Sequence, residues 1–167
     1  MNSMVIYRSR YGNTQKIAYA IAAGLRAWGT VEVLAAEKAQ GIRLRGYDLV
    51  VIGGPTEGHG ITKPLADYID QIGDAFTGVS AAAFDTRLTW PKWMSGSAGG
   101  DIAKRLERFG ANVVAQPASF LVAGKPPALE PGELERAEGW ARSLADKVET
   151  HRRRPDRALY GPAGAGP

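Results

Sequence analysis

Ser9-Arg10-Tyr11-Gly12-Asn13-Thr14 is the stretch of sequence that decides the fold. It follows the apolar run Met4-Val5-Ile6-Tyr7 and precedes a series of apolar residues with the spacing of one helix face: Ile17, Ile21, Leu25 and Trp28. Free backbone N–H groups and the helix dipole at the start of a helix attract an anion, and the hydroxyls of this stretch add donors. The order strand, turn, helix predicts a phosphate-binding loop. For these six residues alone, an ordinary strand-to-helix turn is the alternative.

The rest of the chain repeats the same alternation of strand and helix. We expect further strands over residues 30–35, 49–52, 79–84 and 112–122, the last one broken near Gln116-Pro117, because proline cannot donate to a strand ladder. Helices are expected over residues 62–72, 102–109 and 131–148. Residues 49–52 are apolar throughout, as in a parallel strand covered on both sides. Five strands alternating with four helices predict an α/β fold, with a doubly wound parallel sheet and helices on both faces.

Three unusual loops should meet at one edge of this sheet. They are residues 9–14, 53–60 and 85–100, which follow the first, third and fourth strands. Ligands of open α/β sheets bind beyond the carboxyl ends of the strands, where these loops emerge. The second loop brings Gly58 and His59, and the third brings Trp90 and Trp93, whose flat side chains are suited to enclosing a flat ring. A phosphate at one loop and an aromatic ring between two others predict flavin mononucleotide, FMN.

Several classes of site are excluded by residues that the chain lacks. It has neither G-x-x-x-x-G-K nor G-x-G-x-x-G, which argues against nucleoside triphosphates and dinucleotides. It has no cysteine, no G-x-S-x-G nucleophile elbow and no acidic residue directly after the first or third strand, as a phosphoacceptor domain needs. We expect no metal site, since His59 has no partner that could share a metal with it.

Charge divides the chain into two parts. The formal net charge is +4, but residues 150–167 hold four arginines and one aspartate, which leaves residues 1–149 at +1. No basic face interleaved with aromatics occurs on the body, so we expect no specific nucleic-acid binding. No apolar run is long enough for a membrane span, and we expect a cytoplasmic protein. The interpretation is one domain over residues 1–149 and a disordered basic tail over residues 150–167.

The two glycine-bearing loops carry a resemblance to the flavodoxins. Residues 9–14 are similar to the hydroxyl-rich Thr/Ser-x-Thr/Ser-Gly-x-Thr phosphate loop of that family, with Tyr11 in place of a small hydroxyl residue. Residues 54–60, Gly-Pro-Thr-Glu-Gly-His-Gly, are similar to its second loop, which places Gly58 beside the flavin N5. The resemblance spans residues 4–149 and implies a five-stranded parallel sheet in the order 2-1-3-4-5, of the short-chain type.

The resemblance also implies a set of FMN-binding residues. They are Ser9, Arg10, Tyr11, Gly12, Asn13, Thr14, Pro55, Thr56, Glu57, Gly58, His59, Gly60, Asp85, Thr86, Arg87, Trp90 and Trp93. The third loop departs from the usual Gly-Asp…Tyr pattern of the family, so either tryptophan could be the ring that stacks on the flavin. His59 could also be a solvated turn residue.

The function implied by the resemblance is an electron carrier that shuttles electrons between redox partner proteins through a flavin semiquinone and hydroquinone. One alternative is a flavodoxin-like NAD(P)H:quinone oxidoreductase, and another is a flavodoxin-like protoporphyrinogen oxidase. Flavodoxins are usually acidic, whereas the three predicted loops carry Arg10, Arg87 and Lys92. We therefore expect a hydroquinone potential less negative than that of the acidic members of the family.

Overall fold

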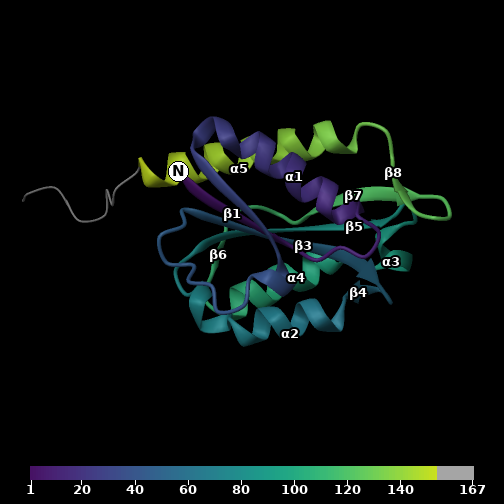
Figure 1. Ribbon diagram of the computed structural model, residues 1–167, viewed down its shortest axis with the longest axis horizontal. Helices are drawn as coiled ribbons and strands as arrows, with labels where there is room; N and C mark the ends of the chain where they lie inside the picture. Colours follow the sequence, from purple (N-terminus) through teal and green to yellow (C-terminus); the bar gives the residue numbers. More distant parts are fainter. Residues whose placement is uncertain (154–167) are drawn as a thin grey trace, which may run out of the picture.

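Five parallel strands form the central layer of the molecule, in the order β2–β1–β3–β5–β7 (Figure 1). The computed structural model describes residues 1–153. The five strands are β1 (Asn2–Tyr7), β2 (Thr30–Ala35), β3 (Leu49–Glu57), β5 (Ser80–Leu88) and β7 (Ala118–Ala123). This is the 2-1-3-4-5 order that the resemblance to the flavodoxins implies, and it is confirmed.

Three two-residue strands extend this sheet. β4 (Gly60–Ile61) pairs antiparallel with β3, β6 (Asn112–Val113) pairs parallel with β5, and β8 (Ala128–Leu129) pairs antiparallel with β7. The predicted fifth strand is thus divided into β6 and β7 around Gln116-Pro117, as expected for a proline in a ladder. The structure therefore adds short pairings to the predicted sheet but leaves its parallel core unchanged.

Helices cover both faces of the sheet (Figure 1). α1 (Asn13–Leu25) and α5 (Glu133–Arg152) lie on one face, and α2 (Lys63–Gln71) and α4 (Ala98–Arg108) lie on the other. The four-residue helix α3 (Lys92–Ser95) and the 3₁₀ turns at Arg26–Trp28, Ala36–Lys38 and Gly73–Phe76 connect these elements. Within residues 1–153, no helix combines the length and apolar character needed to cross a bilayer.

The apolar core is divided by the sheet into two clusters. Ile17 and Ile21 of α1 and Ala141 and Leu144 of α5 pack on one face of the sheet, together with Phe84 from β5. The other cluster lies on the opposite face of the sheet, where α2 and α4 pack. It includes Met4, Ile6, Val50, Ile52, Leu65, Ile69, Ile102 and Leu106. Successive strand residues point to opposite faces, so strands buried on both sides are apolar throughout.

Three predicted boundaries are wrong, because strands and helices extend into predicted loops. β3 continues to Glu57 and β5 to Leu88, and α4 begins at Ala98, so the loops predicted over residues 53–60 and 85–100 are much shorter. α5 continues to Arg152, so residues 150–152 of the predicted tail are helical. Arg152 forms ion pairs with Asp48 at 3.1 Å and Glu149 at 3.5 Å, which hold the last turn in place. Of the predicted tail, residues 154–167 lie outside the described residues.

Tyr68 of α2 gives the fold a predicted dependence on pH. The side chain is 4% exposed and its hydroxyl donates to the Ala39 carbonyl at 3.1 Å, and burial raises its pKa from 10.0 to about 12. Because the folded pKa is higher than the unfolded one, this contribution to stability is fully present below pH 10 and is lost as the pH rises toward 12. The free energy of unfolding, measured in urea, should therefore fall less from pH 8 to pH 11 in Tyr68→Phe than in the wild type.

The remaining loss in Tyr68→Phe should come from two other tyrosines with a raised pKa. The pKa of Tyr47 is also raised to about 12, first by burial and then by its hydrogen bond to Glu32, and burial raises the pKa of Tyr7. At neutral pH the variant should lose about 1 kcal/mol, the usual contribution of one hydrogen bond. Tyr11→Phe, at an exposed position of the first loop, is the control and should keep the wild-type difference between the two pH values. Equal losses at pH 11 in Tyr68→Phe and the wild type would contradict this assignment.

Candidate functional site

The loop between β1 and α1 forms an anion socket. Gly12 is the N-cap of α1 with φ of 84°, a left-handed conformation that glycine adopts readily, and α1 has no hydrogen bond from a capping side chain. The first amides of the helix are therefore not capped by a side chain. Beside them, the Ser9 Oγ is buried and has no hydrogen-bond partner among the described residues. Buried polar groups usually have partners, so an unpaired hydroxyl at a helix N-terminus indicates a place for an acceptor such as a phosphate oxygen.

Thr14 connects this socket to β5, which is separated from β1 in the sheet by β3. Its Oγ1 lies 2.8 Å from the Thr86 Oγ1 of β5, and both side chains are buried. Asn13, by contrast, uses its side chain elsewhere, because its Nδ2 donates to the Pro127 carbonyl at 2.9 Å. Asn13 therefore anchors the β7–β8 connection. Of its two N–H groups, only the backbone one is left for an anion at the socket.

A cavity of about 200 Å³ opens next to the socket. Its wall combines the first loop with residues at the carboxyl ends of β3, β5 and β7: Ser9, Tyr11, Asn13, Thr14, Thr56, Glu57, Thr86, Arg87, Leu88, Val122 and Pro127. This is the meeting of loops at one sheet edge that the sequence predicts. Leu88, Val122 and Pro127 were not among the predicted residues, since nothing in their local sequence distinguishes them from ordinary strand and turn residues.

The second predicted loop is a tight hairpin between β3 and β4. Glu57 pairs with Gly60 across it, and the two residues of the turn, Gly58 and His59, have φ of 55° and 74°. Positive φ at both positions is the property of a type I′ turn, whose twist matches that of the strands. His59 is thus a turn residue, and it is the one residue other than glycine with positive φ among residues 1–153. Arg10 of the first loop lies 3.6 Å from Glu57, which links the two loops by an ion pair.

Arg87 links the residues of the third predicted loop to one another. The Arg87 Nη1 donates to the carbonyls of Leu88 at 3.2 Å and Trp90 at 2.6 Å and to the Ser95 hydroxyl at 3.3 Å. A second cavity, of about 170 Å³, lies between this segment and the hairpin and is lined by Thr56, Gly58, His59, Leu88, Trp90, Met94 and Ser95. Thr56 and Leu88 belong to both cavities, so the two are neighbours at the same edge.

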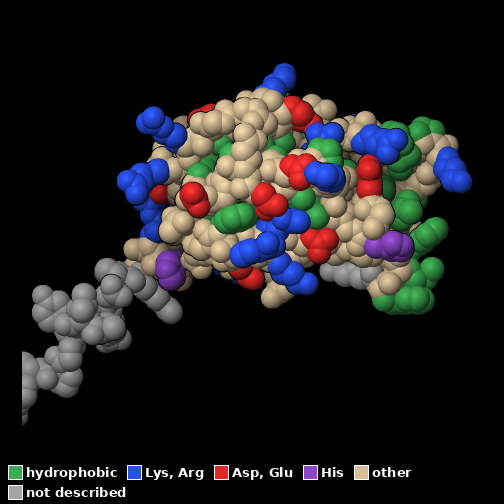
Figure 2. Space-filling view, turned by 90° about the horizontal axis from the view of Figure 1, so that it is seen from below, with side chains coloured by type: hydrophobic (Ala, Val, Ile, Leu, Met, Phe, Trp, Pro, Cys, Tyr) green, Lys and Arg blue, Asp and Glu red, His purple; other side chains and the backbone are tan. Residues whose placement is uncertain are grey.

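The two predicted tryptophans are placed differently. Trp90 lines the second cavity and is 55% exposed, whereas Trp93, on α3, lines neither cavity and is 84% exposed. Five of the seven exposed large apolar side chains of the described chain belong to the first loop or to residues 88–94: Tyr11, Leu88, Trp90, Trp93 and Met94. Figure 2 shows hydrophobic side chains gathered at the end of the molecule where α3 and β4 lie in Figure 1. The rim of the site is thus an exposed apolar surface.

Asp85 lies behind the site rather than on it. Its carboxylate is fully buried, and the Oδ2 accepts from the Ser97 Oγ at 2.7 Å and from the Gly99 backbone N–H at 2.8 Å. These contacts hold the N-terminus of α4, where a negative charge is favourable. Asp85 lines neither cavity, and its Oδ1 is buried without a partner among the described residues. Pro55 and Gly60 also lie outside both linings, on β3 and β4.

The chain matches a protein family and is similar to several solved structures. Residues 4–116 match the family model of the flavodoxin domain. The chain belongs to the flavodoxin family. Among solved structures, it is similar to a flavodoxin from the domain Archaea, with a TM-score of 0.71, 20% identity and coverage of 89% of this chain and 99% of that one. No curated protein sequence matches the chain.

Two further structures show the same fold. Flavodoxin 1 from Bacillus cereus has a TM-score of 0.71 and 23% identity over 90% of this chain and 99% of its own. The flavodiiron protein from Giardia intestinalis has a TM-score of 0.69 and 17% identity over 92% of this chain, but over only 38% of its own. The flavodoxin fold therefore occurs both as a separate protein and as part of a larger one.

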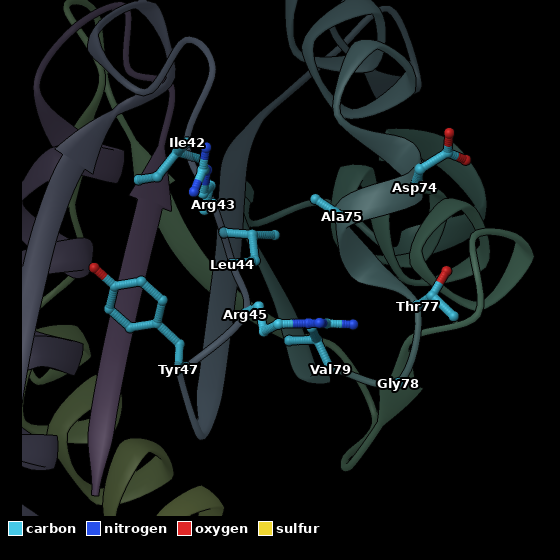
Figure 3. Close-up of a pocket in the computed structure, with 11 residues that line it drawn as sticks. Ile42, Arg43, Leu44, Arg45, Tyr47, Asp74, Ala75, Thr77, Gly78 and Val79 are labelled. Carbon is cyan, nitrogen blue, oxygen red and sulfur yellow. The ribbon is translucent and has the colours of Figure 1, made fainter.

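A larger cavity of this flavodoxin lies at the opposite edge of the sheet (Figure 3). It measures about 580 Å³ and lies between the loop of residues 42–47 and the turn before β5, with Leu44 and Val79 on its walls and Arg45 reaching across it. This edge holds the amino ends of β3 and β5, whereas ligands of open α/β sheets bind at the carboxyl ends. We therefore assign the functional site to the smaller pair of cavities, where the flavodoxin motifs meet.

Gly96 allows the segment after α3 to lie directly against the hairpin. A Cβ at this position would lie 1.7 Å from the His59 carbonyl oxygen, and its φ is 71°. Gly96→Ala should therefore lower the free energy of unfolding by about 2 kcal/mol, partly through strain and partly by displacing the hairpin. Gly78→Ala is the matched control, since it has φ of 74° and nothing within 4 Å of an added Cβ.

Gly78→Ala should lower the free energy of unfolding through backbone strain alone, by about 1 kcal/mol. Urea unfolding of both variants measures the difference. A loss in Gly96→Ala no larger than that in Gly78→Ala would show that the hairpin and residue 96 are not in contact in solution.

Proposed function

We propose that this flavodoxin binds FMN and carries electrons between redox proteins. The observation that supports it is the buried, unpaired Ser9 hydroxyl in the loop before the uncapped amides of α1, on the wall of the first of two neighbouring cavities. A phosphate is an acceptor with negative charge, so it complements both the hydroxyl and the positive end of the helix dipole. The first cavity then receives the phosphate and the sugar chain of FMN, and the second receives its ring.

The residues around the second cavity are suited to a flat ring. Leu88, Trp90 and Met94 supply apolar contact, while the hairpin at Gly58 brings backbone amide and carbonyl groups to the other side. Apolar walls with a few polar groups are the usual composition of a cofactor pocket. When bound, the isoalloxazine supplies the redox chemistry, accepting one or two electrons. The protein holds the ring and limits access of water to it.

The exposed rim supports a protein as the partner. Trp93 and its apolar neighbours surround the mouth of the site and face solvent, and apolar patches of this kind on soluble proteins mark contact surfaces. A partner docked on this rim would lie beside the edge of the ring, which is the arrangement that electron transfer between proteins needs.

A second candidate is an FMN-dependent NAD(P)H:quinone oxidoreductase. The observation that favours it is the apolar lining of the second cavity by Leu88, Trp90 and Met94, which a quinone or nicotinamide ring could share with the flavin. The two candidates use the same cofactor and differ in the substrate that reaches it.

Two measurements separate these possibilities. FMN fluorescence is titrated with purified protein, and quenching at micromolar protein is expected. The flavin-loaded protein is then mixed with NADH or NADPH and a soluble quinone. Slow turnover, together with rapid electron transfer from dithionite-reduced protein to a one-electron acceptor such as cytochrome c, supports the carrier. Rapid turnover supports the reductase. If FMN fluorescence is unchanged at micromolar protein, both candidates fail.

A further inference from the structure

Arg87 is the cation of the cavity wall whose charge is not balanced by a carboxylate. The charged side chains that line the two cavities are Glu57 and Arg87, and Glu57 is paired with Arg10 at 3.6 Å. Within residues 1–153, no carboxylate oxygen lies within 4.0 Å of the Arg87 guanidinium. Asp85, two residues earlier on the same strand, directs its Oδ2 to the N-terminus of α4 instead.

The hydrogen bonds of Arg87 leave its charge in place. Its Nη1 donates to two carbonyls and one hydroxyl, which are neutral acceptors, and its Nε is buried without a partner among the described residues. Because Arg87 is only partly exposed, solvent screens its field less than that of a surface cation such as Arg10.

We propose that Arg87 selects the redox state of the flavin by favouring the fully reduced, anionic ring. This inference rests on the proposed binding of FMN. Uptake of two electrons and one proton by the oxidised ring leaves one net negative charge on it, whereas the oxidised ring is neutral. A fixed cation in the wall lowers the energy of the charged form and leaves that of the neutral form nearly unchanged.

By stabilising the reduced ring, Arg87 would change the class of electron donor that can reduce the protein. Stronger binding of the reduced ring raises the two-electron potential, so the protein accepts electrons from weaker reductants and holds them more tightly. Arg10 does not contribute in the same way, because the carboxylate of Glu57 offsets its charge. The expectation from sequence rested on Arg10, Arg87 and Lys92, and the present proposal concerns Arg87.

The test compares Arg87→Gln with Arg87→Lys and Arg10→Gln. For each FMN-loaded protein, the two-electron potential is measured by dithionite titration, and the dissociation constant of oxidised FMN by fluorescence quenching. The difference between the potentials of bound and free FMN gives the preference for reduced over oxidised FMN, and the dissociation constant of oxidised FMN then gives that of reduced FMN. It should fall about tenfold in Arg87→Gln, which corresponds to about 30 mV for two electrons. It should stay within about twofold of wild type in Arg87→Lys, which keeps the charge, and in Arg10→Gln.

Two results would overturn the inference. Equal losses in Arg87→Gln and Arg87→Lys would show that Arg87 acts only by holding the Leu88, Trp90 and Ser95 contacts, which lysine cannot reproduce. An unchanged preference in Arg87→Gln would show that the charge does not reach the ring. Arg87→Met, which keeps the aliphatic stem, replaces Arg87→Gln if that variant does not fold. Failure of the wild type to bind FMN would instead refute the proposed function.

Discussion

Ser9→Asp will weaken FMN binding about 100-fold and leave riboflavin binding within about threefold of wild type. The Ser9 Oγ is buried at the socket without a partner, so a carboxylate there would lie close to the phosphate. Two unit charges of the same sign 4 Å apart repel by about 4 kcal/mol at an effective dielectric constant of 20. A 100-fold loss corresponds to about 2.7 kcal/mol, which allows for screening and relaxation. Riboflavin has the same ring without the phosphate and avoids this repulsion.

Fluorescence quenching by each flavin measures both affinities in the same protein. Ser143→Asp is the matched control, because it adds the same charge at an exposed position in the middle of α5 and should bind FMN like the wild type. Thermal unfolding of the unloaded proteins checks that Ser9→Asp folds. If Ser9→Asp loses FMN and riboflavin equally, the substitution has damaged the ring site and the phosphate assignment is wrong.

Gly24→Val will destabilise the fold by about 3 kcal/mol. Gly24 lies where α1 crosses α5, and a Cβ there would lie 2.5 Å from the Glu138 backbone oxygen and 2.8 Å from the Ala141 Cβ. The obstacle is backbone and a fully buried methyl group, neither of which can rotate away. The two helices would have to separate, which loosens the packing of both on the sheet and costs about 1–3 kcal/mol or more for an overpacked core.

Gly139→Val, on the partner helix α5, is the control for Gly24→Val. An added Cβ at Gly139 meets nothing within 4 Å, and valine is a slightly better helix former than glycine. The control should therefore be as stable as the wild type or more stable, by up to about 0.5 kcal/mol. Urea unfolding of both variants gives the free energies. A loss below about 1 kcal/mol in Gly24→Val would contradict close packing of α1 on α5.

The order of elements and the place of the site could be predicted from the sequence. Apolar residues at intervals of three and four identify the helices, and the uninterrupted apolar run at residues 49–52 identifies a strand buried on both faces. A sheet of parallel strands brings the loops after its strands to one edge, so Ser9, Gly58 and Trp90 could be placed together without knowing any contact. The structure places all three on the walls of the neighbouring cavities.

The roles of the polar side chains could not be predicted in this way. Asn13 reads from sequence as a phosphate ligand, but its side chain donates to the Pro127 carbonyl, 114 residues away. Asp85 is predicted from sequence to contact the cofactor, and in the structure its Oδ2 accepts from the Gly99 N–H at the start of α4. Arg10 reads as a free positive charge, but Glu57 lies beside it. In each case the partner is distant in the chain, and a polar group forms the hydrogen bonds that its final position offers.

The layers of the fold follow from the amino-acid sequence, because they depend on periodicity and on the alternation of strands with helices. The strand order was implied by the resemblance to the flavodoxins. Tertiary structure decided which of the charges near the site are neutralised, leaving Arg87 without a carboxylate while Arg10 has one. It also decided the left-handed conformation of His59 in its turn. The physical reason is that hydrogen bonds and ion pairs act over a few ångströms between atoms that only the folded chain brings together.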